Sequence, residues 1–186
     1  LATMVGDPGS ATGWPGREEL ALLSLGGGVL IVAAVGWLDD HRSLGAGIRL
    51  CAHVLAVFVS LLPILLIDVA TLSGNPVMPW VLAALALVCI AAVWSINLHN
   101  FMDGIDGLAG SMALVSLSAL IILFAAAGAT GYMNWALIFA VAIVPYLFAN
   151  LKLFGFKRKI FLGDAGSMLL GFLLATVPAP SLVRRC

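Results

Sequence analysis

Charged residues are scarce in this chain of 186 residues. Only 10% are Asp, Glu, Lys or Arg, whereas 62% are hydrophobic, and the mean hydropathy is +1.14. A soluble domain carries about 25% charged residues, so this chain lacks the polar groups that a water-exposed surface needs. The composition excludes an ordinary soluble protein and predicts a polytopic membrane protein whose surface faces the bilayer.

The chain also lacks a net charge and a cysteine motif. The formal net charge is +0, which provides no basic field for nucleic acid, and we expect no nucleic-acid partner. The three cysteines are Cys51, Cys89 and Cys186, and no CxxC pair occurs. Their odd number and the apolar surroundings of two of them favour small buried residues over disulfides or metal ligands.

Long apolar runs divide the sequence into predicted transmembrane helices. About 20 apolar residues cross a bilayer as a helix, and no run alternates polar and apolar residues as a membrane barrel strand does. We predict an all-α, polytopic transmembrane helix bundle of about six spans, with residues 1–186 as a single transmembrane domain. The predicted spans are residues 20–38, 48–67, 80–98, 108–128, 134–151 and 160–177.

The connections between these spans predict the membrane orientation. Connections 39–47, 99–107 and 152–160 alternate with the others, so they share one side of the membrane. Of the 9 Lys and Arg residues in the chain, most lie on this side, and the positive-inside rule makes it cytoplasmic. The pair Arg184 and Arg185 argues mildly for the opposite orientation.

Aspartates from three connections meet on this predicted cytoplasmic side, each at or near the end of a span. An acid at the boundary of an apolar run is a functional hypothesis by default. We therefore expect three acidic clusters to converge on one face of the bundle. The five residues are Asp39, Asp40, Asp103, Asp106 and Asp164.

The first cluster is the pair Asp39 and Asp40, which follows directly on an apolar run. The macrodipole disfavours acids at a helix carboxyl end, and adjacent carboxylates repel unless a cation or a proton neutralises them. The pair therefore favours a functional role. A helix cap remains the alternative for Asp40 alone.

The second cluster belongs to a polar stripe on a predicted helix end. Asn97, Asn100 and Asp103 are spaced three residues apart, and Gly104 and Gly107 let the backbone turn or approach a ligand closely. Amides supply donors and acceptors, whereas carboxylates supply acceptors only. This mixture suits a nucleobase edge and a hydrated Mg²⁺. A glycine-rich turn with capping acids is the alternative.

The third cluster contains Asp164, which lies in "GDAGS" at the start of the last apolar run. The basic cluster Lys157, Arg158 and Lys159 precedes it and suits both topology and phosphate binding. Mg²⁺ binds one or two carboxylates and completes its shell with water and phosphate oxygens. Acids from three connections, an Asn pair and a basic cluster at one membrane face therefore fit Mg²⁺-assisted phosphoryl chemistry.

Three blocks occur in the order "GWLDDHRSL", "NLHNFMDGIDGLAG" and "KRKIFLGDAGS". In this order they resemble the polyprenyl-phosphate N-acetylhexosamine-1-phosphate transferases, bacterial membrane enzymes related to phospho-MurNAc-pentapeptide transferase. The second block is most similar to the branch that starts O-antigen synthesis, a part of lipopolysaccharide and cell-wall biogenesis. That family of glycosyltransferases has about ten or eleven spans, so the resemblance implies that this chain is an internal fragment.

The resemblance implies a reaction and its partners. An N-acetylhexosamine-1-phosphate would pass from a UDP-N-acetylhexosamine to polyprenyl (undecaprenyl) phosphate, releasing UMP at the cytoplasmic face of the bacterial inner membrane. Mg²⁺ is the implied cofactor, with Mn²⁺ as an alternative metal. Besides the two substrates and the bilayer, a homodimer partner is a further expectation.

The resemblance also implies a role for each matched residue. Asp39, Asp40 and Asp164 are the implied catalytic acids, and one of the first two would deprotonate or orient the lipid phosphate. The implied metal ligands are Asn100 and Asp164, the implied nucleotide contacts are Asn97, Asp103 and Asp106, and the implied phosphate ligands are Lys157, Arg158 and Lys159.

Three other protein classes fit less well. A CDP-alcohol phosphotransferase needs further charged residues after its DG pair, and residues 107–149 contain none. An intramembrane prenyltransferase needs a third acid soon after the first pair, and none follows Asp40 before Asp68. A transporter, the alternative that is not an enzyme, would place ionisable groups near mid-membrane, whereas these cluster at one surface.

Overall fold

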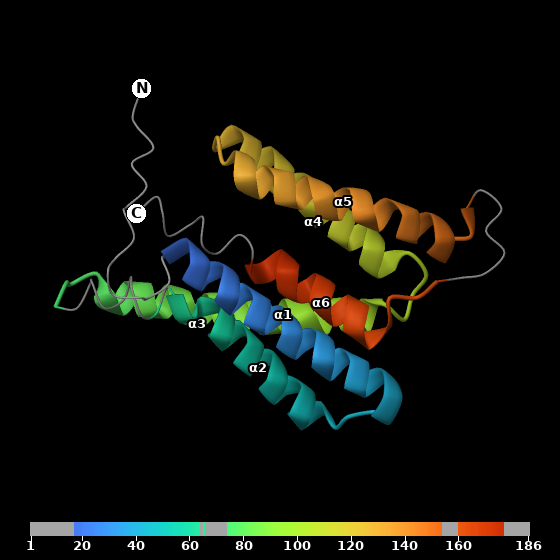
Figure 1. Cartoon of the computed structure of the whole chain (residues 1–186), viewed down its shortest axis with the longest axis horizontal. Helices are drawn as coiled ribbons and strands as arrows, with labels where there is room; N and C mark the ends of the chain where they lie inside the picture. Colours follow the sequence, from blue (N-terminus) through green and yellow to red (C-terminus); the bar gives the residue numbers. More distant parts are fainter. Residues whose placement is uncertain (1–16, 64, 66–73, 154–159, 177–186) are drawn as a thin grey trace.

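The computed structural model describes residues 17–63, 65, 74–153 and 160–176, with side chains from residue 20 onward. Within these ranges the chain is all helix and connection (Figure 1). The predicted all-α class is therefore confirmed. The helices are α1 (Arg17–Arg42), α2 (Ala46–Pro63), α3 (Met78–Met102), α4 (Leu108–Ala126), α5 (Thr130–Asn150) and α6 (Gly163–Thr176).

Five of these helices, α1 to α5, are long and apolar enough to cross a membrane. Helix α6 has 14 residues, and at about 1.5 Å per residue it is shorter than the roughly 30 Å of bilayer hydrocarbon. The sixth predicted span began at residue 160, but the helix begins at Gly163. There φ is +68°, a left-handed conformation that glycine adopts without strain and that separates the helix from the preceding chain.

Two helices extend past the predicted span ends, and both extensions carry site residues. Helix α1 continues through Asp39 and Asp40 to Arg42, and α3 continues through Asn100 to Met102. The apolar pattern stops where polar residues begin, but the helical backbone continues because these polar side chains find partners on other helices. Asp39 and Asp40 therefore lie inside the last turn of α1 instead of following it.

Helix α6 lies at the centre of the molecule (Figure 1). It packs against α1 and α3 on one side and more lightly against α4, which pairs with α5. The core between α1, α2, α3 and α6 contains Val32, Val57, Ile96 and Phe172. A second apolar cluster joins α6 to α4 and α5. A short central helix is thus enclosed by longer ones, and its amino end is positioned by them.

Glycine allows α6 to approach its neighbours closely. A Cβ atom at Gly36 of α1 would lie 2.7 Å from the backbone nitrogen of Ala165 in α6. A Cβ atom at Gly171 would lie 2.6 Å from the carbonyl oxygen of Ser95 in α3. Small residues permit such backbone contact between helices in membranes. The Gly36 contact holds the last turns of α1 against the first turn of α6.

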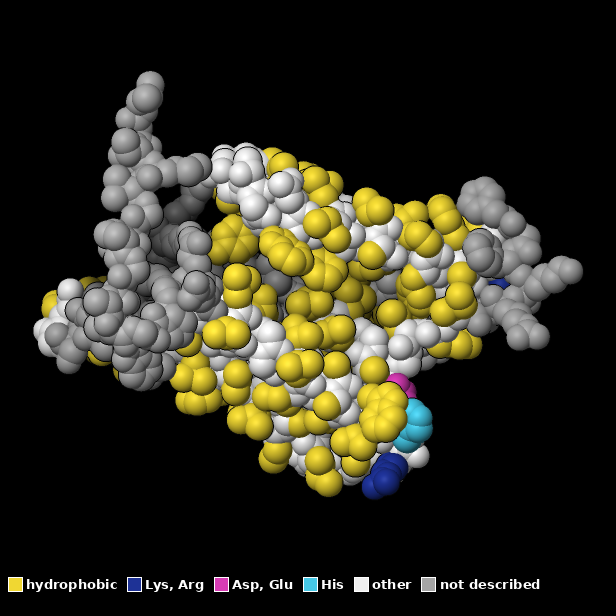
Figure 2. Space-filling model, viewed as in Figure 1, with side chains coloured by type: hydrophobic (Ala, Val, Ile, Leu, Met, Phe, Trp, Pro, Cys, Tyr) yellow, Lys and Arg dark blue, Asp and Glu magenta, His cyan; other side chains and the backbone are white. Residues whose placement is uncertain are grey.

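The outer surface is suited to lipid. Figure 2 shows hydrophobic side chains over most of the visible face, with charged and histidine side chains gathered near one end. Large apolar side chains such as Phe101 and Trp80 are 82% and 75% exposed, which would be unfavourable in water over so wide an area. The α1–α2 and α3–α4 connections lie at the same end (Figure 1), as the alternation of spans predicts.

We predict that Gly36→Ala destabilises the protein by roughly 1–3 kcal/mol, because the added methyl group overpacks the α1–α6 contact. Gly26→Ala is the matched control in the same helix, since nothing lies within 4 Å of a Cβ atom there. Thermal unfolding in detergent checks both variants. Equal melting temperatures for Gly36→Ala and the unmodified protein would contradict the close approach.

Candidate active site

The first turn of α6 is capped by acids from two other parts of the chain. The backbone N–H groups of Asp164 and Ala165 donate to the Asp40 carboxylate at 2.8 and 3.3 Å. The N–H of Gly163 donates to the carboxylate of Asp103. These N–H groups have no partner within the helix, and the positive end of the helix dipole favours anions. Helix α6 thereby draws two of the predicted acidic clusters together.

The side chain of Asp39 meets that of Asp164 beside this cap. Asp39 is only 5% exposed, and its carboxylate oxygens accept the Leu44 N–H at 2.6 Å and Arg49 Nη1 at 2.9 Å. Its carboxyl group also lies beside that of Asp164, and the two groups interact electrostatically. Two carboxylates in contact must share a proton or a cation, so this pair is the strongest candidate for metal binding.

Asn100 joins this carboxylate pair from α3. Its Nδ2 donates to Asp164 Oδ1 at 2.6 Å and to Ser167 Oγ at 3.2 Å. Ser167 is fully buried and donates to the carbonyl oxygen of Gly163 at 2.8 Å. The two predicted metal ligands, Asn100 and Asp164, are therefore neighbours in the fold, and Ser167 fixes the amide beside them.

Asp103 lies at the end of α3, between α6 and α5. Besides the Gly163 N–H, its Oδ1 accepts the Tyr146 hydroxyl at 3.4 Å. Burial raises the pKa of Asp103 above its usual range, and the nearby charges of Asp164 and Asp40 raise it further, against the opposing effect of its hydrogen bonds. Asp103 thus belongs electrostatically to the same acidic group.

The other predicted nucleotide contacts lie in different places. Asp106 is exposed in the α3–α4 connection, and its charge acts on the Tyr146 hydroxyl. Asn97 donates to the Val93 carbonyl at 2.8 Å and to His53 Nδ1 at 3.3 Å, so it faces α2. Helical residues three apart are rotated by roughly 300°, and this drift separates Asn97 from Asn100. The basic cluster at 157–159 lies outside the described residues.

Sequence reasoning missed two residues that organise the site. Arg49 is one of the basic residues on the predicted cytoplasmic side, and it forms an ion pair with Asp39. Asn150, which is 2% exposed, accepts the Gly107 N–H at 2.5 Å and donates to the Ile160 carbonyl at 2.9 Å. It ties the α3–α4 connection to the segment before α6. A polar amide ending a long apolar run was the available signal.

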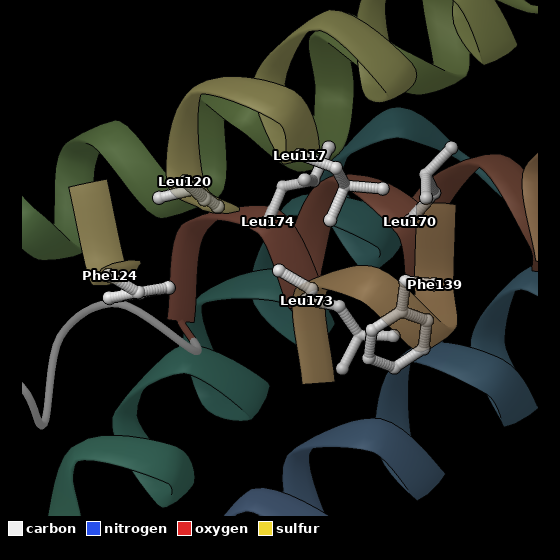
Figure 3. Close-up of a pocket in the computed structure, with 8 residues that line it drawn as sticks. Leu117, Leu120, Phe124, Phe139, Leu170, Leu173 and Leu174 are labelled. Atoms are coloured by element: carbon white, nitrogen blue, oxygen red, sulfur yellow. The ribbon is translucent and has the colours of Figure 1, made fainter. Parts of the chain in front are cut away.

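Two spaces between helices in the described part of the chain have linings that include none of these acidic residues. Figure 3 shows an apolar gap of about 20 Å³ between α4, α5 and α6, lined by residues such as Leu117, Phe139 and Leu174. A larger space of about 380 Å³ between α3, α4 and α6 includes His99, whose Nε2 has no partner among the described residues. Neither offers the charged groups that phosphoryl chemistry requires.

The residues present fit a hydrated divalent cation. No three Asp, Glu, His or Cys side chains in the described part of the chain are placed to hold a metal by themselves. Mg²⁺ seldom requires such a set, since one or two carboxylates with waters and substrate phosphates suffice. The contact between Asp39 and Asp164, with the Asn100 amide beside it, supplies that smaller donor set.

Comparison with known proteins gives the family. The model of glycosyl transferase family 4 matches residues 22–180. The chain belongs to this family. Undecaprenyl-phosphate alpha-N-acetylglucosaminyl 1-phosphate transferase of Yersinia pestis is 36% identical over 146 residues, which are 76% of this chain and 40% of that protein. The protein of the same name from Salmonella typhi is 34% identical over 162 residues, covering 83% and 42% of the two chains.

The enzyme of that name from Haemophilus influenzae is 35% identical over 153 residues, covering 77% of this chain and 41% of its own. The family 4 chain therefore spans about two fifths of the length of these relatives. No solved structure matches it. The matched region includes all the acidic residues of the α6 site.

We predict that Asn150→Ala costs roughly 1–3 kcal/mol of unfolding free energy, because the buried Gly107 N–H loses its acceptor. Amide hydrogen exchange at Gly107 should accelerate in the same variant. The matched control is Asn75→Ala, since Asn75 is exposed and its bond to the Val77 N–H can be replaced by water. Unchanged exchange at Gly107 would show that Asn150 does not hold this turn.

Proposed function

We propose that the protein containing this chain transfers an N-acetylhexosamine-1-phosphate from a UDP-sugar to undecaprenyl phosphate. The observation that carries the proposal is the contact between Asp39 and Asp164 at the amino end of α6, beside Asn100. Family membership and the printed names of the relatives support the same chemistry. Initiation of O-antigen synthesis is the proposed context, on the resemblance of "NFMDGIDG" to that branch.

The acidic group supports a division of tasks in this reaction. A lipid phosphate oxygen would attack the phosphorus that carries the sugar, and the bond from that phosphorus to UMP would break. Asp39, held beside Asp164 by Arg49 and the Leu44 N–H, would orient the lipid phosphate or accept its proton. When bound, Mg²⁺ would neutralise charge between the two phosphates, and Asp164 and Asn100 would hold it.

In this proposal, neighbouring residues bind the nucleotide and the remaining phosphate. Asp103 and Asp106 would accept hydrogen bonds from the uracil N3–H and the ribose hydroxyls, whereas Asn97, which faces α2, lies apart from them. Lys157, Arg158 and Lys159 would bind phosphate. The proposed location is the cytoplasmic face of the bacterial inner membrane, because most Lys and Arg residues lie on the side of the acidic connections.

We predict that Asp164→Asn abolishes most transferase activity in the full-length protein and raises the Mg²⁺ concentration needed for what remains. Asparagine keeps the shape of the side chain but removes the charge that would hold the cation. Activity with undecaprenyl phosphate and UDP-N-acetylglucosamine, titrated with Mg²⁺, is the measurement. Turnover and Mg²⁺ dependence equal to those of the unmodified protein would refute the metal assignment.

We predict that Asp106→Asn weakens UMP binding to the folded full-length protein by roughly tenfold to a hundredfold, as expected for losing one charge-assisted hydrogen bond. Calorimetric titration with UMP gives the affinity, and the melting temperature verifies folding. If Asp106 only supports the connection, the melting temperature should fall while the UMP affinity of the folded protein stays unchanged.

A further inference from the structure

We propose that Arg49 is a positioning residue for the reaction, which acts by fixing the Asp39 carboxylate against Asp164. The inference rests on the proposed function and adds to it a residue outside the three sequence blocks. Its basis is the ion pair of 2.9 Å between Arg49 Nη1 and Asp39 Oδ2, beside the contact between the two carboxyl groups.

Asp39 is held through both of its carboxylate oxygens. Oδ1 accepts the Leu44 N–H at 2.6 Å, and Oδ2 accepts Arg49. Leu44 lies in the α1–α2 connection, where Ser43 adopts a φ of +46° and donates its N–H to the Asp39 carbonyl at 2.9 Å. The α1–α2 connection and the first turn of α2 therefore hold the Asp39 side chain from two sides.

Arg49 also compensates the charge that this placement creates. The Asp39 side chain is 3% exposed and touches a second carboxyl group, so without a cation the two acids would repel. The guanidinium is 33% exposed, so its remaining donors stay available to water. Arg49 can therefore orient one oxygen of Asp39 without covering the side of Asp39 that faces Asp164.

Packing shows that the helices do not depend on this ion pair. Helices α1 and α2 meet along buried apolar residues, including Val32, Ala56 and Val57, at a distance from the connection. An ion pair that is partly exposed contributes little to stability, about 0–1 kcal/mol. Loss of Arg49 should therefore disturb the orientation of Asp39 much more than the stability of the bundle.

The test uses Arg49→Gln and Arg49→Lys in the full-length protein, with Arg42→Gln as the matched control. Arg42 is exposed at the end of α1, at the same end of the bundle. Arg49→Gln should lower kcat by roughly tenfold to a hundredfold, with KM for the UDP-sugar within about threefold. Arg49→Lys keeps the charge and should recover most of the lost kcat, while Arg42→Gln should behave as unmodified.

Two further measurements decide how Arg49 acts. In a double-mutant cycle with Asp39→Asn, the kcat effects should be far from additive, because Arg49 works through Asp39. The melting temperature of Arg49→Gln should stay near that of Arg42→Gln. Additive effects, an unchanged kcat in Arg49→Gln, or a loss of kcat explained by unfolding would each overturn the role of Arg49.

The two levels of the proposal fail in different ways. If the unmodified protein transfers no sugar phosphate to the lipid, the proposed function is wrong, and the role of Arg49 in it is overturned as well. If the unmodified protein is active and Arg49→Gln equals it, only the role of Arg49 is overturned.

Discussion

The amino end of α6 is the constraint on which the site depends. Its first N–H groups have no acceptor within the helix, and the positive end of the helix dipole favours anions there. Asp40 from α1 and Asp103 from the end of α3 accept these groups. Hydrogen-bond satisfaction therefore recruits acids that are far apart in the sequence. The fold thereby concentrates negative charge at the amino end of α6, at the end of the bundle where the connections meet (Figure 1).

Small residues determine how closely these acids can meet. Gly36 allows the α1 backbone to touch that of Ala165, and the positive φ of Gly163 starts α6 beside the Asp40 carboxylate. A larger side chain at either position would move α1 and α6 apart. Because a hydrogen bond to the cap extends over only 2.8 Å, even a small displacement would break it. The close glycine contacts between α1 and α6 therefore determine the geometry of the acidic group.

The sequence predicted the helical class, six spans of which five are helices of spanning length, and the meeting of Asp40, Asn100, Asp103 and Asp164. These predictions follow from the length of the apolar runs and from the alternation of connections between the two sides of the membrane. Both depend on the bilayer more than on the details of side-chain packing. The ends of α1 and α3 were predicted too early, because hydropathy falls where polar residues begin while the helical backbone continues. Side-chain partners could not be predicted, since they depend on helix rotation. Asn97 faces His53 for this reason, and Arg49 meets Asp39 because of how α2 is rotated against α1.

The same rotation gives the two adjacent acids different environments. Successive helical residues differ by roughly 100° around the axis, so Asp40 faces the N–H groups of α6 while Asp39 faces Arg49 and the Asp164 side chain. Asp40 is committed to backbone donors, which hold both of its oxygens. Asp39 instead lies beside a second carboxyl group, that of Asp164. A pair that looks redundant in the sequence is therefore asymmetric in the fold, because Asp40 caps helix α6 and Asp39 faces Arg49 and Asp164.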